Sequence, residues 1–240
     1  MKNEGVFNRF YEGRIFSELT EEIENEILEK KQEVFWDIYD TDWDEYLMRF
    51  AGVRPGSLFR TIQETASRKP LYGLELAGYG YMFESEQTHF TAGVHVALSD
   101  PLSALDPSEK DSAKRFFVKG DVLDGNTWRK LSVMKKVVTK KAGFDVIIFS
   151  AYGGSKVIGG NEDVHDGITA LLTQKCWPLL SQEDGHLLIS YTSSSSNLGN
   201  WITNLDKIEG ISGRFMNVGA ENYLYLNRTH NYQGDLPRFN

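Results

Sequence analysis

The sequence is poor in the features that mark secreted and membrane proteins. Among its 240 residues the only cysteine is Cys176, so no disulfide can form within the chain. The densest apolar run, residues 146–149, is far shorter than the about 18 residues of a membrane span. Residues 1–14 lack the apolar stretch of a signal peptide. These absences predict a cytoplasmic protein without membrane association. Cys176 itself is expected to be a small buried apolar group.

Composition and charge narrow the class of protein further. With 40% hydrophobic and 25% charged residues, the chain is expected to fold. Residues 1–50 hold 14 acidic and 6 basic residues, so the net charge of −8 lies wholly in this segment. Because acidic chains repel phosphate backbones, we expect no nucleic-acid partner. One basic cluster is expected to be the solvent-exposed side of a helix: Arg129, Lys130, Lys135, Lys136, Lys140 and Lys141.

The chain divides into an acidic helical segment and a larger core. Leu19, Ile23 and Ile27 recur at near-helical spacing, with glutamates between them, so residues 1–56 are expected to be an acidic helical extension. The sequence pattern changes at Leu71, where short apolar runs begin to alternate with stretches of helical character. The expected domains are residues 1–56, a core over residues 57–229 and a polar tail over residues 230–240.

The order of elements in the core indicates a mainly parallel sheet built by crossovers. Two further apolar runs near the end of the chain are joined by a turn of four residues, 219–222, which forces an antiparallel hairpin. The expected strands are 71–76, 93–98, 116–119, 145–150, 186–191, 214–218 and 223–227. The expected helices of this region are 107–115, 127–141, 164–180 and 197–208. The pattern predicts a seven-stranded sheet closed by the hairpin, with helices on both faces.

Three features fall at the ends of expected strands, where open α/β sheets bind ligands. Residues 75–80 carry an acid, Glu75, into a turn that contains Gly78 and Gly80. Asp100 lies 20 residues beyond Gly80, the spacing at which an acid can bind a ribose. Gly120-Asp121-Val122 follows the third strand, where an aspartate can accept from an adenine amine. Each feature alone is more typical of a helix cap or turn, but their order makes them support one another.

In this order the features resemble the class I S-adenosylmethionine-dependent methyltransferases, which have a Rossmann-like fold. In that family the first strand ends in an acid and a glycine turn, the second ends in an acid that holds the ribose, and a Gly-Asp pair after the third holds the adenine. The resemblance covers residues 71–228 and implies S-adenosylmethionine as cofactor. The cofactor-binding residues it implies are Glu75, Ala77, Gly78, Gly80, Asp100, Asp121, Val122 and Ser150.

The turn departs from the family pattern. The family usually places glycines two, four and six residues after the acid, whereas here the glycines lie three and five residues after Glu75 and Ala77 stands at the second position. A nicotinamide-binding reading needs G-x-G-x-x-G, but Phe83 occupies the third glycine position. The terminal hairpin also argues against that reading.

The substrate side carries fewer signals. The loop after the fourth strand lacks the Asn/Asp-Pro-Pro-aromatic motif of resembling amino-methyltransferases, and Tyr152 lies where the acceptor would be. His165 is a candidate general base, with a surface or helix-capping histidine as the alternative. No histidine of the sequence shows metal-ligand spacing, so no metal site is expected.

The sequence therefore predicts a methyltransferase acting on a small-molecule acceptor, with Tyr152 and His165 in the catalytic site. The alternative is a non-catalytic adenosyl-binding or interaction protein that retains the fold. N-terminal helices often form a lid over the substrate entrance in the resembling family, and we expect residues 1–56 to dock in this way. The sequence leaves the acceptor atom and the oligomeric state open.

Overall fold

The computed structural model describes residues 70–78, 80, 83, 90–97, 114–140, 142–149, 162–191, 196–218 and 221–239. The strands are β1 (Tyr72–Leu76), β2 (Ala92–Ala97), β3 (Arg115–Lys119), β4 (Val146–Phe149), β5 (Asp184–Tyr191), β6 (Ile211–Val218) and β7 (Glu221–Thr229). The helices are α6 (Gly125–Val138), α7 (Glu162–Cys176) and α8 (Ser196–Leu205), with a 3-10 turn, η4 (Trp177–Leu179), directly after α7.

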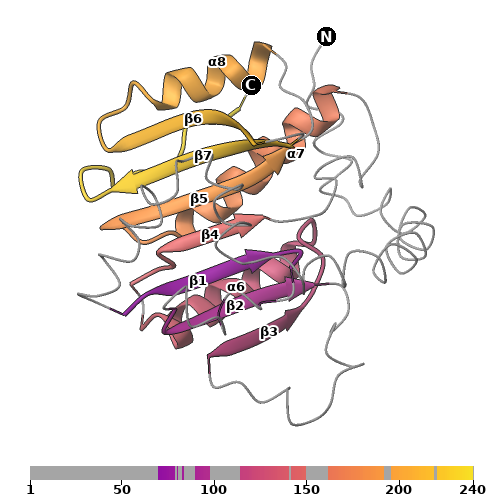
Figure 1. The fold of residues 1–240 in the computed structure, drawn as a ribbon, viewed down its shortest axis with the longest axis vertical. Helices are drawn as coiled ribbons and strands as arrows, with labels where there is room; N and C mark the ends of the chain where they lie inside the picture. Colours follow the sequence, from indigo (N-terminus) through magenta and orange to yellow (C-terminus); the bar gives the residue numbers. More distant parts are fainter. Residues whose placement is uncertain are drawn as a thin grey trace, which may run out of the picture.

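The strands form one seven-stranded sheet in the order β3-β2-β1-β4-β5-β7-β6 (Figure 1). β1 to β5 run parallel, whereas β7 is inserted antiparallel between β5 and β6. Val218 pairs with Glu221, so the closing hairpin is tight. The predicted sheet, its parallel part and its terminal hairpin are all confirmed.

All four predicted helices differ from the structure at their ends, and α6 and α8 each end three residues earlier than predicted, at Val138 and Leu205. The prediction of a helix over 107–115 is wrong at its last residue, because Arg115 is the first residue of β3. Residues 107–113 lie outside the described residues. The helix predicted over 164–180 ends at Cys176, and Pro178 then lies in the 3-10 turn η4. Proline lacks the N–H that an α-helix interior needs, which explains the change.

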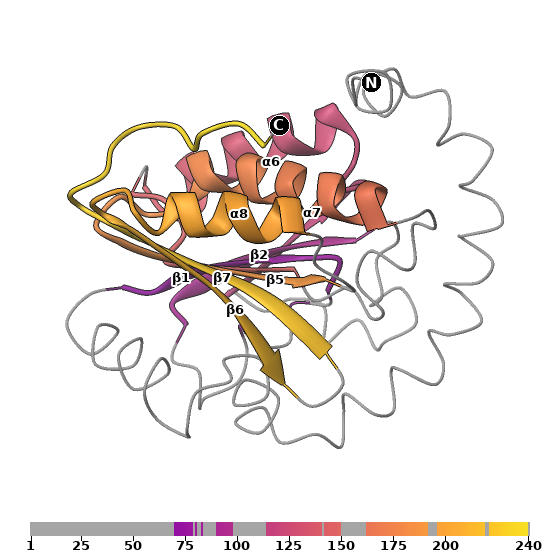
Figure 2. The ribbon, with the colours of Figure 1, turned by 90° about the horizontal axis from the view of Figure 1, so that it is seen from above.

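The described helices α6, α7 and α8 all cover one face of the sheet (Figure 2). Alternate strand residues point into this layer and are buried against the helices: Leu74, Leu76, Val94, Val96, Val118, Ile147, Phe149, Leu187, Ile189, Leu224 and Leu226. The basic residues Arg129, Lys130 and Lys136 of α6 face solvent, as predicted. The expected helical extension over residues 1–56 lies outside the described residues, so the predicted helices on the second face are not tested.

The second face of the sheet is shaped by glycines at β1 and β2. Phe83 is fully buried, and a side-chain carbon added to Gly73 or Gly93 would collide with its ring. The Phe83 ring meets Phe90 edge-on at 5.2 Å between centroids. The two glycines therefore provide the space in which an aromatic ring packs directly on the sheet.

The end of the chain, residues 230–239, packs back on the core as a segment that we call the C-terminal strap (Figure 2). The indole N–H of Trp177 donates to the Gly234 carbonyl, and that of Trp201 donates to the Pro237 carbonyl, each at 3.0 Å. Leu236 of the strap is buried in the hydrophobic core. The strap thus satisfies two indole donors and closes the helical side of the sheet.

We expect Leu236→Ala to lower the free energy of unfolding by about 2 kcal/mol, because it removes a buried side chain and leaves a cavity. Urea denaturation of the full chain measures the loss. Arg238→Ala, at an exposed position of the same strap, is the control and should leave the midpoint unchanged. Equal midpoints for all three proteins would show that the strap is not docked in solution.

Among the described residues, none of the helices has both the length and the apolar composition that crossing a membrane requires.

Candidate cofactor site

The sheet has its topological switch point at β1. β1 pairs with β2 on one side and with β4 on the other. The strands therefore add outward on one side of β1 up to β3, and from β4 on the other side. Open α/β sheets bind ligands in the crevice outside the carboxyl ends of the strands at such a point. The arrowheads of β1 to β5 point to one common edge (Figure 1), and this edge carries the turns after β1 and β3.

The turn after β1 is braced by the acid that precedes it. Glu75 is 4% exposed, and its Oε2 accepts a hydrogen bond of 2.6 Å from the Gly80 N–H. A side chain at Gly78 would collide with the Glu75 carboxylate and displace it from its hydrogen bond to Gly80. The carboxylate of Glu75 therefore holds the turn itself.

The turn reaches a glycine-like backbone conformation without the usual glycine. Ala77 has φ 58° and Gly80 has φ 75°, both in the left-handed region that favours glycine. Ala77 stands two residues after the acid, where the resembling family usually has glycine. The departure in sequence is thus accommodated by an alanine under backbone strain.

We expect Ala77→Gly to raise the free energy of unfolding by about 1 kcal/mol, since glycine adopts positive φ without the penalty from Cβ. Chemical denaturation measures the change. Ala92→Gly, at an extended position in β2, is the matched control and should be destabilising. A loss of stability in Ala77→Gly would mean that the left-handed turn is not the conformation in solution.

Two buried polar residues lie beneath the turn. The Nδ1 of His95 is 3.3 Å from the Gly78 carbonyl oxygen. A Cβ on Gly80 would lie 2.7 Å from His95 Cδ2 and 2.8 Å from Arg115 Cδ, so the turn rests on both side chains. Neither His95 nor Arg115 is among the site residues predicted from the sequence. The two-residue period of β2 was the available signal, because it places His95 on the same face as Glu75.

The turn after β3 presents Asp121 in a half-buried position. Its Oδ1 accepts from the Leu123 N–H at 2.8 Å, and the Val122 carbonyl accepts from the Trp128 indole N–H at 2.8 Å. A side chain at Gly120 would collide with Thr127. Burial raises the pKa of Asp121 above its usual range, and the nearby Asp124 adds to this, while the Leu123 hydrogen bond opposes it.

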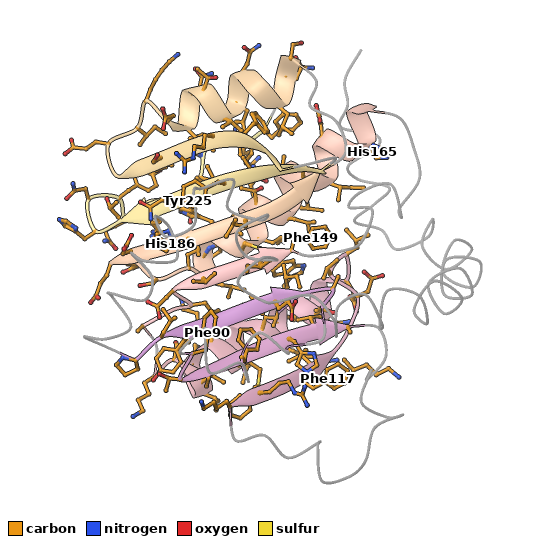
Figure 3. The ribbon with its side chains drawn as sticks, in the orientation of Figure 1. Phe90, Phe117, Phe149, His165, His186 and Tyr225 are labelled. Carbon is orange, nitrogen blue, oxygen red and sulfur yellow. The ribbon has the colours of Figure 1, made fainter. Side chains whose placement is uncertain are left out.

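His165 lies near the start of α7, on the side to which the parallel strands point (Figure 3). Its side chain is half-buried, and its carbonyl accepts from the Thr169 hydroxyl at 2.9 Å. The other predicted site residues, Asp100, Ser150 and Tyr152, lie outside the described residues. The structure therefore gathers Glu75, Ala77, Gly78 and Gly80 at the end of β1 and places Asp121 and Val122 after β3, two strands away in the sheet.

Asp145, directly before β4, lies at the amino ends of the parallel strands, opposite the candidate site. Asp145 is buried, and its Oδ2 accepts from the Tyr72 N–H at 2.9 Å, which fixes the start of β1 beside β4. This role is structural. In the part of the chain that the structure describes, no three His, Cys, Asp or Glu residues group as metal ligands would.

A second buried polar cluster lies on β5 and β7 (Figure 3). His186 Nδ1 is 3.0 Å from the Tyr225 hydroxyl, and His186 Nε2 is 3.5 Å from Asp184 Oδ2. Burial raises the pKa of Tyr225 to about 12 despite the guanidinium of Arg214 over its ring. The Tyr225 hydroxyl therefore stays protonated at neutral pH and is a hydrogen-bond partner of His186.

Comparison with known proteins identifies the fold. No protein-family model matches the sequence, and no curated protein matches it either. The plantazolicin methyltransferase BpumL, solved with a desmethylPZN analog and S-adenosylhomocysteine, is similar over 92% of this chain and 99% of its own, with a TM-score of 0.53 and 13% identity. The fold is that of a class I methyltransferase.

Two further structures resemble this methyltransferase fold at lower TM-scores. The 1,6-didemethyltoxoflavin-N1-methyltransferase from Burkholderia thailandensis, solved with S-adenosylhomocysteine, gives 0.45 at 16% identity and covers 85% of this chain and 86% of its own. The human methyltransferase-like protein 13, also solved with S-adenosylhomocysteine, gives 0.47 at 13% identity and covers 82% and 86%.

Proposed function

We propose that the protein is an S-adenosylmethionine-dependent methyltransferase that acts on a small-molecule acceptor. The observation that carries the proposal is the pair of shaped turns at one edge of a methyltransferase fold. One is braced by Glu75, and the other presents the half-buried Asp121. BpumL, which has this fold, was solved with S-adenosylhomocysteine and a desmethylPZN analog.

The described residues fit an adenosyl group. Asp121 uses Oδ1 to accept from its own turn, and we assign its Oδ2 to the exocyclic amine of adenine. At Ala77, Gly78 and Gly80 the turn carries no side chain larger than a methyl group, which lets a ligand approach the backbone and suits the methionine end of the cofactor. When bound, this cofactor supplies a sulfonium methyl group for in-line transfer. The protein's task is then to align the acceptor and to remove its proton where it has one.

The alternative is a non-catalytic adenosyl-binding or interaction protein with the same fold. The observation that favours it is the use of the Gly80 N–H by Glu75. An amide that already donates within the turn is occupied, so the methionine carboxylate needs another donor. Binding of the cofactor without transfer to any acceptor would support this alternative.

The acceptor class is proposed from charge. The net charge of −8 disfavours a polynucleotide substrate. The exposed bases Arg129, Lys130 and Lys136 lie on α6, which contacts the turn after β3 through the buried Thr127 and Trp128 and not through these bases. A small molecule is therefore the acceptor we propose.

Methyl transfer from cofactor labelled in the methyl group, measured across a panel of small-molecule acceptors, tests the proposed function. We expect transfer to at least one acceptor class, and Tyr152→Ala should reduce it while leaving S-adenosylhomocysteine affinity nearly unchanged. Full activity of Tyr152→Ala would place the acceptor on another loop. Tight cofactor binding with no transfer in the whole panel would decide for the non-catalytic alternative.

The raised pKa of Asp121 gives a pH-dependent stability that can be measured. Between the ordinary pKa of an aspartate and the raised value, the folded state binds more protons than the unfolded state, so stability falls as pH rises through this window. Asp121→Asn removes this titration but keeps an oxygen that can accept from Leu123. We expect the variant to match the wild type at low pH and to become the more stable protein as pH rises.

Denaturation at a series of pH values checks this expectation, with Glu209→Gln at an exposed position as control. Parallel stability curves for wild type and Asp121→Asn would show that the Asp121 pKa is the same in the folded and unfolded states.

A further inference from the structure

The turn after β1 has a second brace, which comes from the neighbouring strand. His95 is 1% exposed and lies in β2 directly beside Glu75 in the parallel register. Its Nδ1 is 3.3 Å from the Gly78 carbonyl oxygen. A carbonyl oxygen only accepts, so Nδ1 carries the proton and donates this hydrogen bond. The ring also contacts Phe117 of β3 at 5.0 Å between centroids, which fixes its orientation.

The two braces act on different atoms of one short segment. Glu75 accepts from the N–H of Gly80, and His95 donates to the carbonyl of Gly78. The segment needs them because glycine has the greatest backbone freedom of any residue and Ala77 is held at a disfavoured φ of 58°. Removing the His95 donor releases the Gly78 carbonyl while the Glu75 bond remains.

We propose that His95 is a positioning residue for the methionine end of the cofactor, acting through the hydrogen bond to Gly78 and the packing under Gly80. The inference rests on the proposed function. The effect of His95 on binding is expected to be confined to the methionine end of the cofactor. The adenine end is proposed to bind at Asp121, whose turn is fixed separately by the Leu123 N–H. Loss of His95 therefore weakens ligands that reach the turn and spares ligands that stop at the ribose.

The test compares S-adenosylhomocysteine with adenosine, which lacks the amino-acid end. Calorimetric titration of the full chain gives both dissociation constants for the wild type, His95→Leu and His95→Asn. His95→Leu keeps a similar volume but has no donor, and we expect it to weaken S-adenosylhomocysteine about three- to tenfold, the scale of one hydrogen bond, with adenosine affinity unchanged. His95→Asn retains a side-chain N–H near the Nδ1 position and should recover most of the lost affinity.

Val94→Ala is the control for general destabilisation. Val94 lies in the same strand, is fully buried and faces the helices, so this variant should lower the melting temperature without changing the ratio of the two dissociation constants. Equal losses for S-adenosylhomocysteine and adenosine in His95→Leu, or no loss for either, would overturn the positioning role while leaving the proposed function intact. A wild type that binds neither ligand would overturn both.

Discussion

Replacing His165 with alanine is expected to lower the turnover of methyl transfer about 10²–10⁴-fold, the usual contribution of a general base. The expectation applies to acceptors that must lose a proton. His165 is half-buried near the start of α7, on the side to which the parallel strands point (Figure 3). Histidine is the side chain that most often acts as a general base in enzymes.

Single-turnover and steady-state rates with labelled cofactor measure the effect. His230→Ala is the matched control, because His230 is exposed in the C-terminal strap and should leave the rate unchanged. S-adenosylhomocysteine affinity should be the same in both variants. Full turnover in His165→Ala with an acceptor that carries a proton would identify His165 as a surface or capping histidine and move the base elsewhere.

Phe83→Ala is expected to lower the free energy of unfolding by about 3–5 kcal/mol, the typical cost of removing a fully buried aromatic ring. The ring packs directly on the backbone of Gly73 and Gly93 and edge-on against Phe90, so its removal opens a cavity on the second face of the sheet. Urea denaturation compared with Phe83→Leu measures how the cost depends on the lost volume.

A double-mutant cycle identifies the contact behind this cost. Gly93→Ala alone should be destabilising, because its new methyl group collides with the Phe83 ring. In the Phe83→Ala background the same methyl group enters the cavity, so its cost should largely disappear. An equal cost of Gly93→Ala in both backgrounds would show that the ring does not lie over Gly93.

Most of the sheet could be predicted from the sequence because its signals are local. Short apolar runs bounded by turns predicted all seven strands, and the short 219–222 connection predicted the hairpin, which β6 and β7 confirm. The extra residues of β6 and β7 beyond the predicted bounds were missed because residues such as Ser212, Gly213 and Asn222 are not strand-like by composition. Their pairing is imposed by the neighbouring strand rather than by propensity.

The position of the candidate site could be predicted from the sequence, but the contacts that its residues make could be predicted only in part. The order of acid, glycine and Gly-Asp signals identified the turns after β1 and β3 as candidate ligand sites. The tasks of Glu75 and His95 were not predictable, because they depend on how the turn folds back over β1 and β2. The strained Ala77 was equally hidden, since alanine in a sequence does not indicate a positive φ.

Calorimetric titration with S-adenosylhomocysteine shows most directly whether the carboxyl edge of β1 to β4 holds an adenosyl site. We expect saturable binding by the wild type and no binding of nicotinamide dinucleotides. Asp121→Asn and Asp100→Ala should each weaken binding by about 1.5–3 kcal/mol, the scale of hydrogen bonds to charged groups. Absence of S-adenosylhomocysteine binding by the folded wild type, or binding of a dinucleotide in its place, would contradict this expectation.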